Sequence, residues 1–310
     1  MKITNKKILA ATLSLGLILA GCGKDEKAEE KPAQTEAPAE KEDTKEIAKA
    51  ADYDFSVVSR EEGSGTRGAF TELVGLEEEV DGAKEDMTTQ EAIVQNSTNG
   101  VMQTVSQDKE AIGYISLGSL NDTVKAVKVE GVEATEENIV NGTYKISRPF
   151  NLAYKEDKIN DLAKDFLKFC LSEDAQALTL KEGYVPLKDT EKYEPAKVSG
   201  TLTVAGSTSV TPLMQKMAEK YQELNPDAKI EIQSTGSSAG IEAVIDGAAD
   251  IAMASRELKD EEKDKLAVEV IATDGIAVVV NPASKVEDLT MDQLKQIFKG
   301  ELKSTSELGK

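Results

Sequence analysis

Residues 59–67 have the sequence Ser-Arg-Glu-Glu-Gly-Ser-Gly-Thr-Arg, the most informative stretch of the chain. It follows an apolar run that ends at Val58 and leads into an amphipathic run from Thr66 to Leu73, so we expect a strand, a turn and a helix. Gly63 and Gly65 permit the sharp turn. Hydroxyls beside the free N–H groups of a helix start, with two arginines, favour a site for a tetrahedral oxyanion. A surface helix cap is the alternative, but it needs one hydroxyl and no arginine.

The composition narrows the class of partner. The 310 residues include 37 Lys and Arg against 57 Asp and Glu, a formal net charge of -20. This charge disfavours nucleic acid, whose phosphate backbone requires a basic face. It is compatible with a small anion, because salt screens distant surface charges beyond about 10 Å. The chain has no histidine, so the usual general base and zinc ligand are missing. We therefore expect a protein that is not an enzyme and that has neither cofactor nor metal.

The N-terminal residues predict export and attachment to a membrane. Residues 1–22 combine early lysines with an apolar run, Ile8 to Leu19, that is short for a transmembrane helix. The run ends in Leu-Ala-Gly-Cys, which resembles the lipobox of bacterial lipoproteins, so Cys22 is the predicted lipidation site. Residues 23–51 are rich in Glu, Lys, Ala and Pro and predict a disordered, charged linker. The protein is thus expected to be extracytoplasmic and lipid-anchored to the bacterial cell membrane.

From residue 52 onward, apolar strands alternate with amphipathic helices, which predicts an α/β fold with mainly parallel sheets. The expected strands are Phe55–Val58, Ala111–Ile115, Val124–Val129, Thr201–Ala205, Lys229–Ile232, Ile251–Ala254 and Ile276–Val280. The expected helices are Thr66–Leu73, Val101–Gln107, Thr135–Val140, Ile159–Leu171, Glu173–Glu182, Leu213–Leu224, Ile241–Ile245 and Met291–Phe298. The segment from Tyr144 to Tyr154 is expected to be extended and broken at Arg148-Pro149.

Three further motifs lie at expected strand-to-helix junctions: Gly206–Pro212, Gly236–Gly240 and Ala254–Leu258. Together with the first stretch they resemble the phosphate-specific substrate-binding proteins of ABC transporters. The resemblance covers most of Phe55–Leu187 and Leu202–Leu308. It implies a two-lobed, periplasmic-binding-protein-like fold of type II. In such a fold inorganic phosphate is trapped between the lobes and delivered to an ABC transporter permease in the membrane.

The resemblance also implies which residues bind phosphate. Arg60 is expected to pair with the anion, and Glu62 to orient Arg60. Three helix N-termini would converge on the anion. The other predicted donors are Ser64, Gly65 and Thr66 of the first helix start, Thr208 and Ser209 of the second, and Ser237 of the third.

Arg256 departs from the family pattern, because well-known members carry an aspartate there that accepts the proton of phosphate and so excludes sulfate. Arg256 itself contacts the anion, pairs with a carboxylate outside the site, or lies on the surface. Selectivity then depends on another acceptor, such as Glu61, Glu62 or a backbone carbonyl. Another oxyanion, such as sulfate or molybdate, and phosphate sensing without transport are therefore alternatives. A phosphatase-like enzyme using Ser64 or Thr66 is disfavoured, because no obvious base accompanies these hydroxyls.

The two parts of the chain stand in the reverse of the family's usual order. Residues 52–190 resemble the C-terminal part of the fold and residues 201–310 the N-terminal part, with a polar joint at 191–200. This order indicates a circular permutation in which the chain closes in cis, with residues 310 and 52 close together in one lobe. A domain-swapped dimer or array and a fragment of a longer tandem protein are the alternatives.

The permuted arrangement also predicts what each lobe contains. One lobe should combine Leu202–Thr273 with Lys155–Leu187, and the other Val278–Leu308 with Phe55–Ser147. The chain should cross between the lobes near Asp274–Val278 and Ile146–Tyr154.

Overall fold

The computed structural model describes residues 52–309 of the chain. The predicted signal peptide, the lipidation site Cys22 and the predicted linker lie outside these residues. None of the helices within residues 52–309 combines the length and the apolar character that a membrane span requires.

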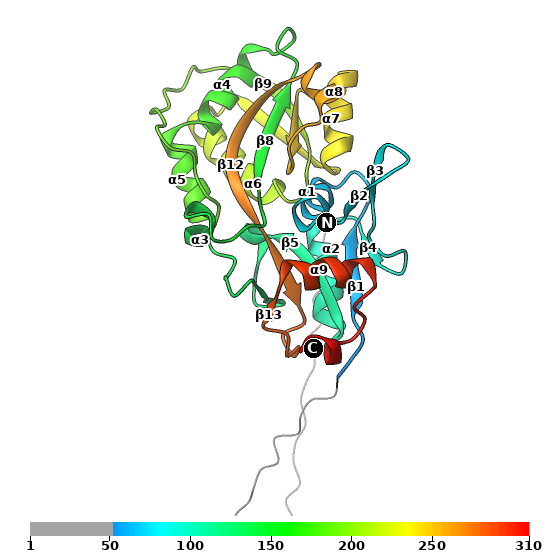
Figure 1. The fold of residues 1–310 in the computed structure, drawn as a ribbon. Coiled ribbons are helices and arrows are strands. Elements are labelled where there is room, and N and C mark those ends of the chain that lie inside the picture. The colour runs from blue at the N-terminus through cyan, green and yellow to red at the C-terminus, as the bar shows by residue number, and fades with distance from the viewer. Residues whose placement is uncertain (1–51, 310) are drawn as a thin grey trace, which may run out of the picture. The chain divides into compact units, whose positions relative to one another are not determined.

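One continuous sheet passes through the described residues (Figure 1). Its strands are β1 (Ser56–Arg60), β4 (Ile93–Gln95), β5 (Ala111–Ser116), β6 (Lys125–Ala126), β8 (Ser147–Tyr154), β9 (Gly200–Gly206), β10 (Ala228–Ser234), β11 (Ile251–Ala254) and β12 (Ala267–Val280). They follow the order β10-β9-β11-β8-β12-β5-β1-β4, with β6 paired to β12. Strand β9 pairs in parallel with β10 and β11, and β1 with β4 and β5. Every antiparallel pair of this sheet includes β8 or β12. The predicted α/β class is therefore confirmed.

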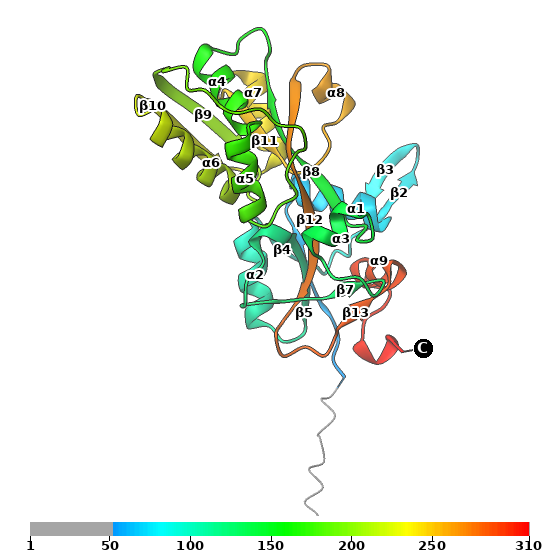
Figure 2. The same ribbon diagram turned by 90° about the vertical axis from the view of Figure 1, so that its left-hand side faces the viewer.

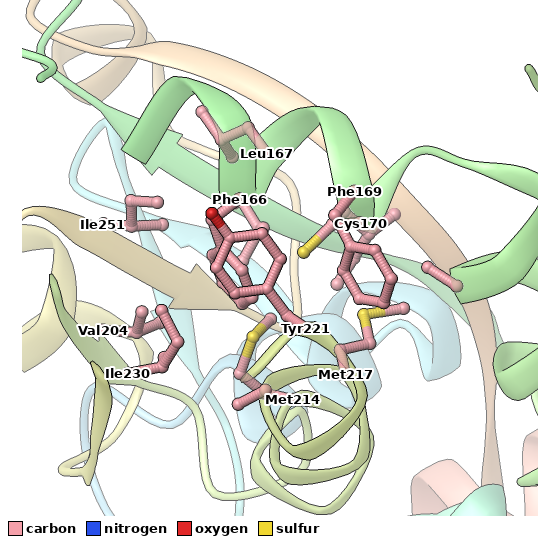
Figure 3. Close-up of a cluster of buried hydrophobic side chains, with 14 of the residues drawn as sticks. Phe166, Leu167, Phe169, Cys170, Val204, Met214, Met217, Tyr221, Ile230 and Ile251 are labelled. Carbon is pink, nitrogen blue, oxygen red and sulfur yellow. The ribbon is translucent and has the colours of Figure 1, made fainter. Parts of the chain in front are cut away.

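Strands β9, β10 and β11 carry one lobe, called here the β9 lobe. Its helices are α4 (Asp161–Cys170), α5 (Glu173–Lys181), α6 (Thr211–Leu224), α7 (Ser237–Asp246) and α8 (Asp260–Lys263). Leu162, Phe166 and Phe169 recur at helical spacing on α4 and are all buried. They pack with residues such as Val204 and Tyr221 in the core shown in Figure 3. This lobe therefore joins segments from before residue 190 to segments from after residue 200.

Strands β1, β4 and β5 carry the second lobe, called here the β1 lobe. Its helices are α1 (Gly65–Val74), α2 (Thr98–Gln107), α3 (Glu136–Val140) and α9 (Met291–Lys299), with the short 3-10 helices η1 (Leu117–Ser119) and η2 (Thr305–Glu307). The ring of Phe70 on α1 stacks on Tyr114 of β5 at 4.0 Å and meets Phe298 of α9 edge-on at 4.8 Å. This core also draws on both parts of the chain, as the permuted arrangement predicts.

Two small strand pairs lie apart from the continuous sheet, and three of their four strands were not predicted from the sequence, whereas the fourth lies within the expected strand Val124–Val129. Strands β2 (Glu77–Val80) and β3 (Ala83–Asp86) form a hairpin, and β13 (Asp288–Leu289) pairs with β7 (Lys128–Val129). Asp81 and Gly82 adopt φ of 52° and 83°, the geometry of a two-residue hairpin turn. The run of glutamates in β2 has no apolar alternation, so it gave no strand pattern in the sequence.

Strands β8 and β12 connect the lobes, and Figure 2 shows them passing side by side from one to the other. Residues Ala267–Gly275 of β12 pair with β8, and residues Ile276–Val280 pair with β5 of the β1 lobe. The chain also crosses along β8, since Ile146 is buried in the β1 lobe core and Phe150 in the β9 lobe core. Both crossings fall where the sequence predicted them.

The predicted break in the extended segment at Arg148-Pro149 is wrong, because β8 continues through both residues. Pro149 faces Thr273 in the register of β8 and β12. Thr273 turns away from Pro149, since its N–H donates to the Val185 carbonyl and its carbonyl accepts from the Val185 N–H, each at 2.9 Å. Pro149 therefore occupies a position that needs no donor, where proline is tolerated in a sheet.

The first and last described segments lie side by side in the β1 lobe. The Phe55 N–H donates to the Lys303 carbonyl at 2.7 Å, and the Thr305 N–H donates to the Tyr53 carbonyl at 3.0 Å. The expectation that the two ends meet in one lobe is thus confirmed for residues 53–55 and 303–305.

Candidate functional site

The predicted strand, turn and helix form around residues 59–67. Strand β1 ends at Arg60, and α1 begins at Gly65. Gly63 has φ of 82°, which a side chain would strain. Ser64 caps the helix, since its hydroxyl accepts a hydrogen bond from the Arg67 N–H at 3.4 Å.

A second helix start lies after β9. Gly206 has φ of 140°, and a Cβ there would lie 2.2 Å from the Met253 carbonyl oxygen, so only glycine fits. The Ser207 hydroxyl accepts from the N–H groups of Ser209 at 3.2 Å and Val210 at 3.4 Å. Ser207 thus caps this turn, which leaves the hydroxyls of the next two residues free to act in the site.

A third helix start, that of α7, begins at Ser237 after Gly236, which has φ of 97°. The Ser237 hydroxyl accepts from the Ser255 N–H at 3.2 Å, and Ser255 follows β11 directly. A Cβ on Gly240 would lie 2.4 Å from the Ala205 carbonyl oxygen, so glycine lets α7 pack closely on β9.

These helix starts meet between the lobes. Arg60 Nη2 of the β1 lobe donates to Thr208 Oγ1 of the β9 lobe at 3.1 Å. The hydroxyls of Thr66 and Ser209, also from opposite lobes, lie 2.8 Å apart. At Gly65 a Cβ would lie 2.4 Å from Ser237 Oγ and 2.8 Å from Ser255 Oγ, so the backbone of α1 approaches the opposite lobe closely. The structure therefore brings together seven of the eight predicted binding residues: Arg60, Ser64, Gly65, Thr66, Thr208, Ser209 and Ser237.

A fourth helix start joins this cluster and was missed in the sequence. Thr98, the first residue of α2, is buried, and its hydroxyl lies 3.1 Å from Ser209 Oγ and 3.4 Å from Thr208 Oγ1. Ser97 caps the helix by accepting from the Gly100 N–H at 3.1 Å. The stretch Ser-Thr-Asn-Gly at residues 97–100 lies two residues after the apolar pair Ile93-Val94 and combines hydroxyls with a glycine, as the other helix starts do, and that signal could have revealed it.

The positive charge of the cluster comes from Arg60, which is only 2% exposed. Glu61 holds it through two hydrogen bonds of 2.8 Å, to Arg60 Nε and Nη2. Glu62, which was expected to orient Arg60, is exposed, so that prediction is wrong and Glu61 has the role. The reason is local: β1 ends at Arg60, and the next residue still lies close enough to form a bidentate pair, whereas the turn directs Glu62 outward.

Arg256 lies at the rim of the site. Its Nη1 donates to Glu262 Oε2 at 2.7 Å and to the Glu257 carbonyl at 2.9 Å, while its Nη2 donates to Glu262 Oε1 at 2.8 Å and to Ser238 Oγ at 3.1 Å. All four terminal N–H bonds of the guanidinium are thus used within the β9 lobe. Of the alternatives considered for Arg256, the structure shows the pair with a carboxylate, and the predicted direct contact with the anion is not supported.

A cleft of about 880 Å³ opens beside the cluster, and Ser64, Arg67, Ser238 and Arg256 are among the residues that line it. Arg67 is fixed in the wall by Asp86, whose Oδ2 lies 2.6 Å from Arg67 Nε. Burial by itself raises the pKa of Asp86, but hydrogen bonds from Thr88 and Arg67 lower it below its ordinary value. The rim therefore carries two fixed ion pairs, Arg67 with Asp86 and Arg256 with Glu262.

An ion pair at the crossing of β8 and β12 lies next to this cluster. Arg148 Nη2 donates to Asp274 Oδ2 at 3.0 Å, and both side chains are buried. Arg148 Nη1 donates to the Ser255 carbonyl at 3.0 Å, and the Ser116 hydroxyl donates to Asp274 Oδ1 at 3.0 Å. Ser255 therefore connects the crossing of β8 and β12, called here the hinge, to the site, because its carbonyl accepts from Arg148 and its N–H donates to Ser237 Oγ.

The cluster suits a tetrahedral oxyanion in its chemistry. Hydroxyls donate or accept, the guanidinium donates, and helix N-termini supply N–H groups and a positive dipole end. Ser64 and Thr66 bond only to a backbone N–H and a hydroxyl, so within residues 52–309 neither has a base that could activate it as a nucleophile. No group of three or more potential metal ligands occurs in the described residues. The geometry is that of a binding site.

Comparison with known proteins identifies relatives along the whole chain. The family model of the PBP superfamily domain matches residues 23–174 and 191–309. Phosphate-binding protein PstS 2 of Streptococcus agalactiae is 47% identical over 306 residues, which cover 98% of this chain and 97% of that protein. The phosphate-binding protein PstS of Bacillus subtilis is 40% identical over 126 residues, which cover 39% of this chain and 41% of that protein.

A solved structure shows the same similarity. The crystal structure of a phosphate ABC transporter, phosphate-binding protein from Streptococcus pneumoniae, has a TM-score of 0.67 and 43% sequence identity. The match covers 82% of this chain and 99% of that one.

Proposed function

Since this chain belongs to the PBP superfamily and, within it, to the family of phosphate-binding proteins, we propose that it captures inorganic phosphate between its two lobes and delivers it to an ABC transporter permease for import. The observation that carries the proposal is the pairing of anion-binding groups across the cleft. Arg60 reaches Thr208, and Thr66 reaches Ser209, from opposite lobes. An anion bound to both lobes would stabilise the closed form, as in other hinged binding proteins.

The proposed phosphate ligands are the side chains and N–H groups at the four helix starts. They are Arg60, Ser64, Gly65, Thr66, Thr208, Ser209 and Ser237, to which the structure adds Thr98. Glu61 acts through Arg60, because both of its oxygens are occupied by the guanidinium.

We place the protein outside the cytoplasm and infer that a lipid on Cys22 anchors it to the membrane. The lipobox-like Leu-Ala-Gly-Cys supports this anchor, and residues 23–51 would then act as the tether. Labelling of cells with a radioactive fatty acid tests it: the wild-type chain should be labelled, and a Cys22→Ala chain should not.

Capture of another tetrahedral oxyanion, such as sulfate, is a second candidate that one observation favours. Position 256 carries an arginine and no carboxylate, although the resemblance to phosphate-specific binding proteins leads us to expect an aspartate there, and Glu61 is fully engaged by Arg60. The hydroxyls of the cluster can accept the proton of phosphate, but they can equally donate to sulfate. Selectivity must therefore be measured.

Calorimetric titration of phosphate and then sulfate into protein freed of phosphate tests both candidates. Tight binding of phosphate near one per chain, with no heat from sulfate, supports phosphate capture with a hydroxyl or carbonyl as the acceptor. Binding of both anions supports the second candidate. A folded protein that binds neither would contradict the proposed function.

We further propose that the order of the two parts is a circular permutation relative to family members such as the Bacillus subtilis protein. The pairing of residues 53–55 with 303–305 supports closure in cis. The contrast between the full-length match to the streptococcal relative and the partial match to the Bacillus one is consistent with a different order of parts. A mass measurement in solution should find a monomer at all concentrations, whereas a concentration-dependent dimer would favour domain swapping.

A further inference from the structure

The lobes touch through their backbones at one point on the rim of the cleft. The Ser238 N–H of the β9 lobe donates to the Gly63 carbonyl of the β1 lobe at 3.1 Å. A Cβ added to Gly63 would lie 3.2 Å from Ser238 Cβ, so glycine permits this close approach. This hydrogen bond can exist only when the cleft is closed.

The side chain of the same serine is held by Arg256. Arg256 Nη2 donates to Ser238 Oγ at 3.1 Å. The guanidinium also donates hydrogen bonds of 2.7 and 2.8 Å to the two carboxylate oxygens of Glu262. The aliphatic part of Arg256 also reaches the opposite lobe, since a Cβ on Gly68 of α1 would lie 3.6 Å from Arg256 Cδ. Arg256 therefore packs against Gly68 of the β1 lobe while it positions Ser238 of its own β9 lobe.

Glu262 is in turn fixed on α8. Its Oε2 accepts from the Lys259 N–H at 2.8 Å, and its side chain is 12% exposed. Burial by itself raises the pKa of Glu262, but the hydrogen bonds from Arg256 and Lys259 outweigh it and lower the pKa below the ordinary value. The carboxylate is thus charged at neutral pH, and the pair with Arg256 is intact.

We propose that Arg256 is a positioning residue for closure: held by Glu262, it fixes Ser238 so that the Ser238 N–H bonds Gly63 across the cleft, and it slows release of the bound anion without touching it. This inference rests on the proposed function, because it names a residue that sets how long the captured phosphate stays. Arg256 thus contributes to the contact between the lobes through Ser238 and through its packing on Gly68.

The decisive variant is Glu262→Gln, since the two possible roles of Arg256 predict opposite results. If Arg256 positions Ser238, loss of the carboxylate charge loosens the guanidinium, and phosphate dissociates about tenfold faster, the factor expected for one weakened charged hydrogen bond. If Arg256 is instead a ligand of the anion, Glu262→Gln frees its guanidinium, and dissociation becomes slower or stays unchanged. Stopped-flow measurement of phosphate release distinguishes them, and the second result overturns the proposal.

Glu261→Gln is the matched control, because it removes the same charge from the neighbouring, exposed position of α8 that also lines the cleft. Its release rate should stay within about twofold of the wild type, as expected for an exposed charge. An equal acceleration in Glu261→Gln and Glu262→Gln would mean that cleft charge, and not the pair with Arg256, controls release, and it would overturn the proposal.

Ser238→Ala breaks the same link from the other end. It should also speed release, and the double variant with Glu262→Gln should release phosphate no faster than the faster single variant, because both act through one contact. Multiplied effects would overturn the proposal. A folding defect is recognised separately, since it lowers the number of phosphates bound per chain and leaves the release rate of the folded fraction unchanged.

The proposal can also fail or succeed independently of the bound anion. Spin labels at two exposed positions, Glu72 on α1 and Glu242 on α7, report the distance between the lobes without any ligand. Glu262→Gln should give a longer or broader distance distribution than the wild type. An identical distribution would overturn the closure role, whereas a wild type that binds no phosphate would overturn the proposed function alone.

Discussion

Two arginine–glutamate pairs, one in each lobe, have closely similar local chemistry. In each pair one glutamate holds the guanidinium through two short hydrogen bonds, and Nη2 donates to a hydroxyl at 3.1 Å. The difference lies in that hydroxyl. Arg60 reaches Thr208 of the opposite lobe, at the centre of the hydroxyl cluster, whereas Arg256 reaches Ser238 of its own lobe, at the rim.

This difference determines what each arginine can do. Arg60 lies where four helix starts meet, so its charge is available to an anion held between the lobes. The terminal N–H groups of Arg256 all donate to Glu257, Glu262 and Ser238 of its own lobe, so none is left for an anion. An arginine paired with a glutamate is therefore not by itself evidence of an anion ligand. The location of the hydroxyl to which Nη2 donates, in the cluster for Arg60 and at the rim for Arg256, is the better indication.

A third arginine, Arg148, forms a buried pair with Asp274 whose expected role is to stabilise the fold, and it provides a reference for the other two pairs. Arg148→Met leaves Asp274 buried and unpaired where β8 meets β12, which should lower the free energy of unfolding by about 3–5 kcal/mol. Urea denaturation measures it. Lys216→Met, which removes an exposed ion pair with Glu219, is the control and should change stability by less than about 0.5 kcal/mol. A loss below 1 kcal/mol in Arg148→Met would show that the pair contributes little to the hinge.

Arg60→Ala should have the largest effect on binding. It removes the only guanidinium bonded to the hydroxyl cluster in the described residues and leaves Glu61 to repel the anion, so phosphate affinity should fall by about 3 kcal/mol. Thr208→Ala, on the opposite lobe, should cost about 1.5–3 kcal/mol as a hydrogen bond to a charged group. Calorimetry measures both. Unchanged affinity in the two variants would show that the site is mapped wrongly and would remove the distinction between Arg60 and Arg256.

Much of the fold could be predicted because its signals are local. Apolar strands such as β5 and β11 are buried throughout, and the helix starts combine glycine with hydroxyl residues. The first half of β12 was missed because Glu269 and Asp274 interrupt its apolar pattern. Asp274 is tolerated there because Arg148 and Ser116, far away in the sequence, satisfy its carboxylate.

The site could be predicted where its signals are local in the sequence, and not where it depends on contacts between distant residues. Three of the four helix starts could be recognised from the glycines and hydroxyls of the sequence, so most of the residues that meet at the cleft could be named before their contacts were known, whereas Thr98 of α2 was missed. Which glutamate pairs with which arginine could not be deduced, because that depends on distances across turns. Glu61 rather than Glu62 holds Arg60, and Glu262, six positions after Arg256, is its partner.

Thr98→Val tests how far the hydroxyl cluster extends beyond the predicted residues. The change keeps the shape and removes one hydroxyl that lies 3.1 Å from Ser209 Oγ, so phosphate affinity should fall by about 0.5–1.5 kcal/mol. Thr104→Val, on the same helix but bonded to Gln95 outside the cluster, is the control and should bind phosphate as the wild type does. Equal binding by both variants would confine the anion site to the three helix starts named from the sequence.

The last and smallest expected effect concerns the contribution of the Arg256–Glu262 pair to the free energy of unfolding, which should depend on pH. The pKa of Glu262 is lowered in the folded protein, so the pair contributes its full stability above the ordinary carboxyl pKa and loses it as the pH falls through the lowered value. The difference in unfolding free energy between the wild type and Glu262→Gln should therefore be constant near neutral pH, on the order of 1 kcal/mol, and should shrink below about pH 4.5. Denaturation at several pH values measures it. A difference that grows on acidification would have the wrong sign for a carboxylate held by Arg256, and the closure role would lose its anchor.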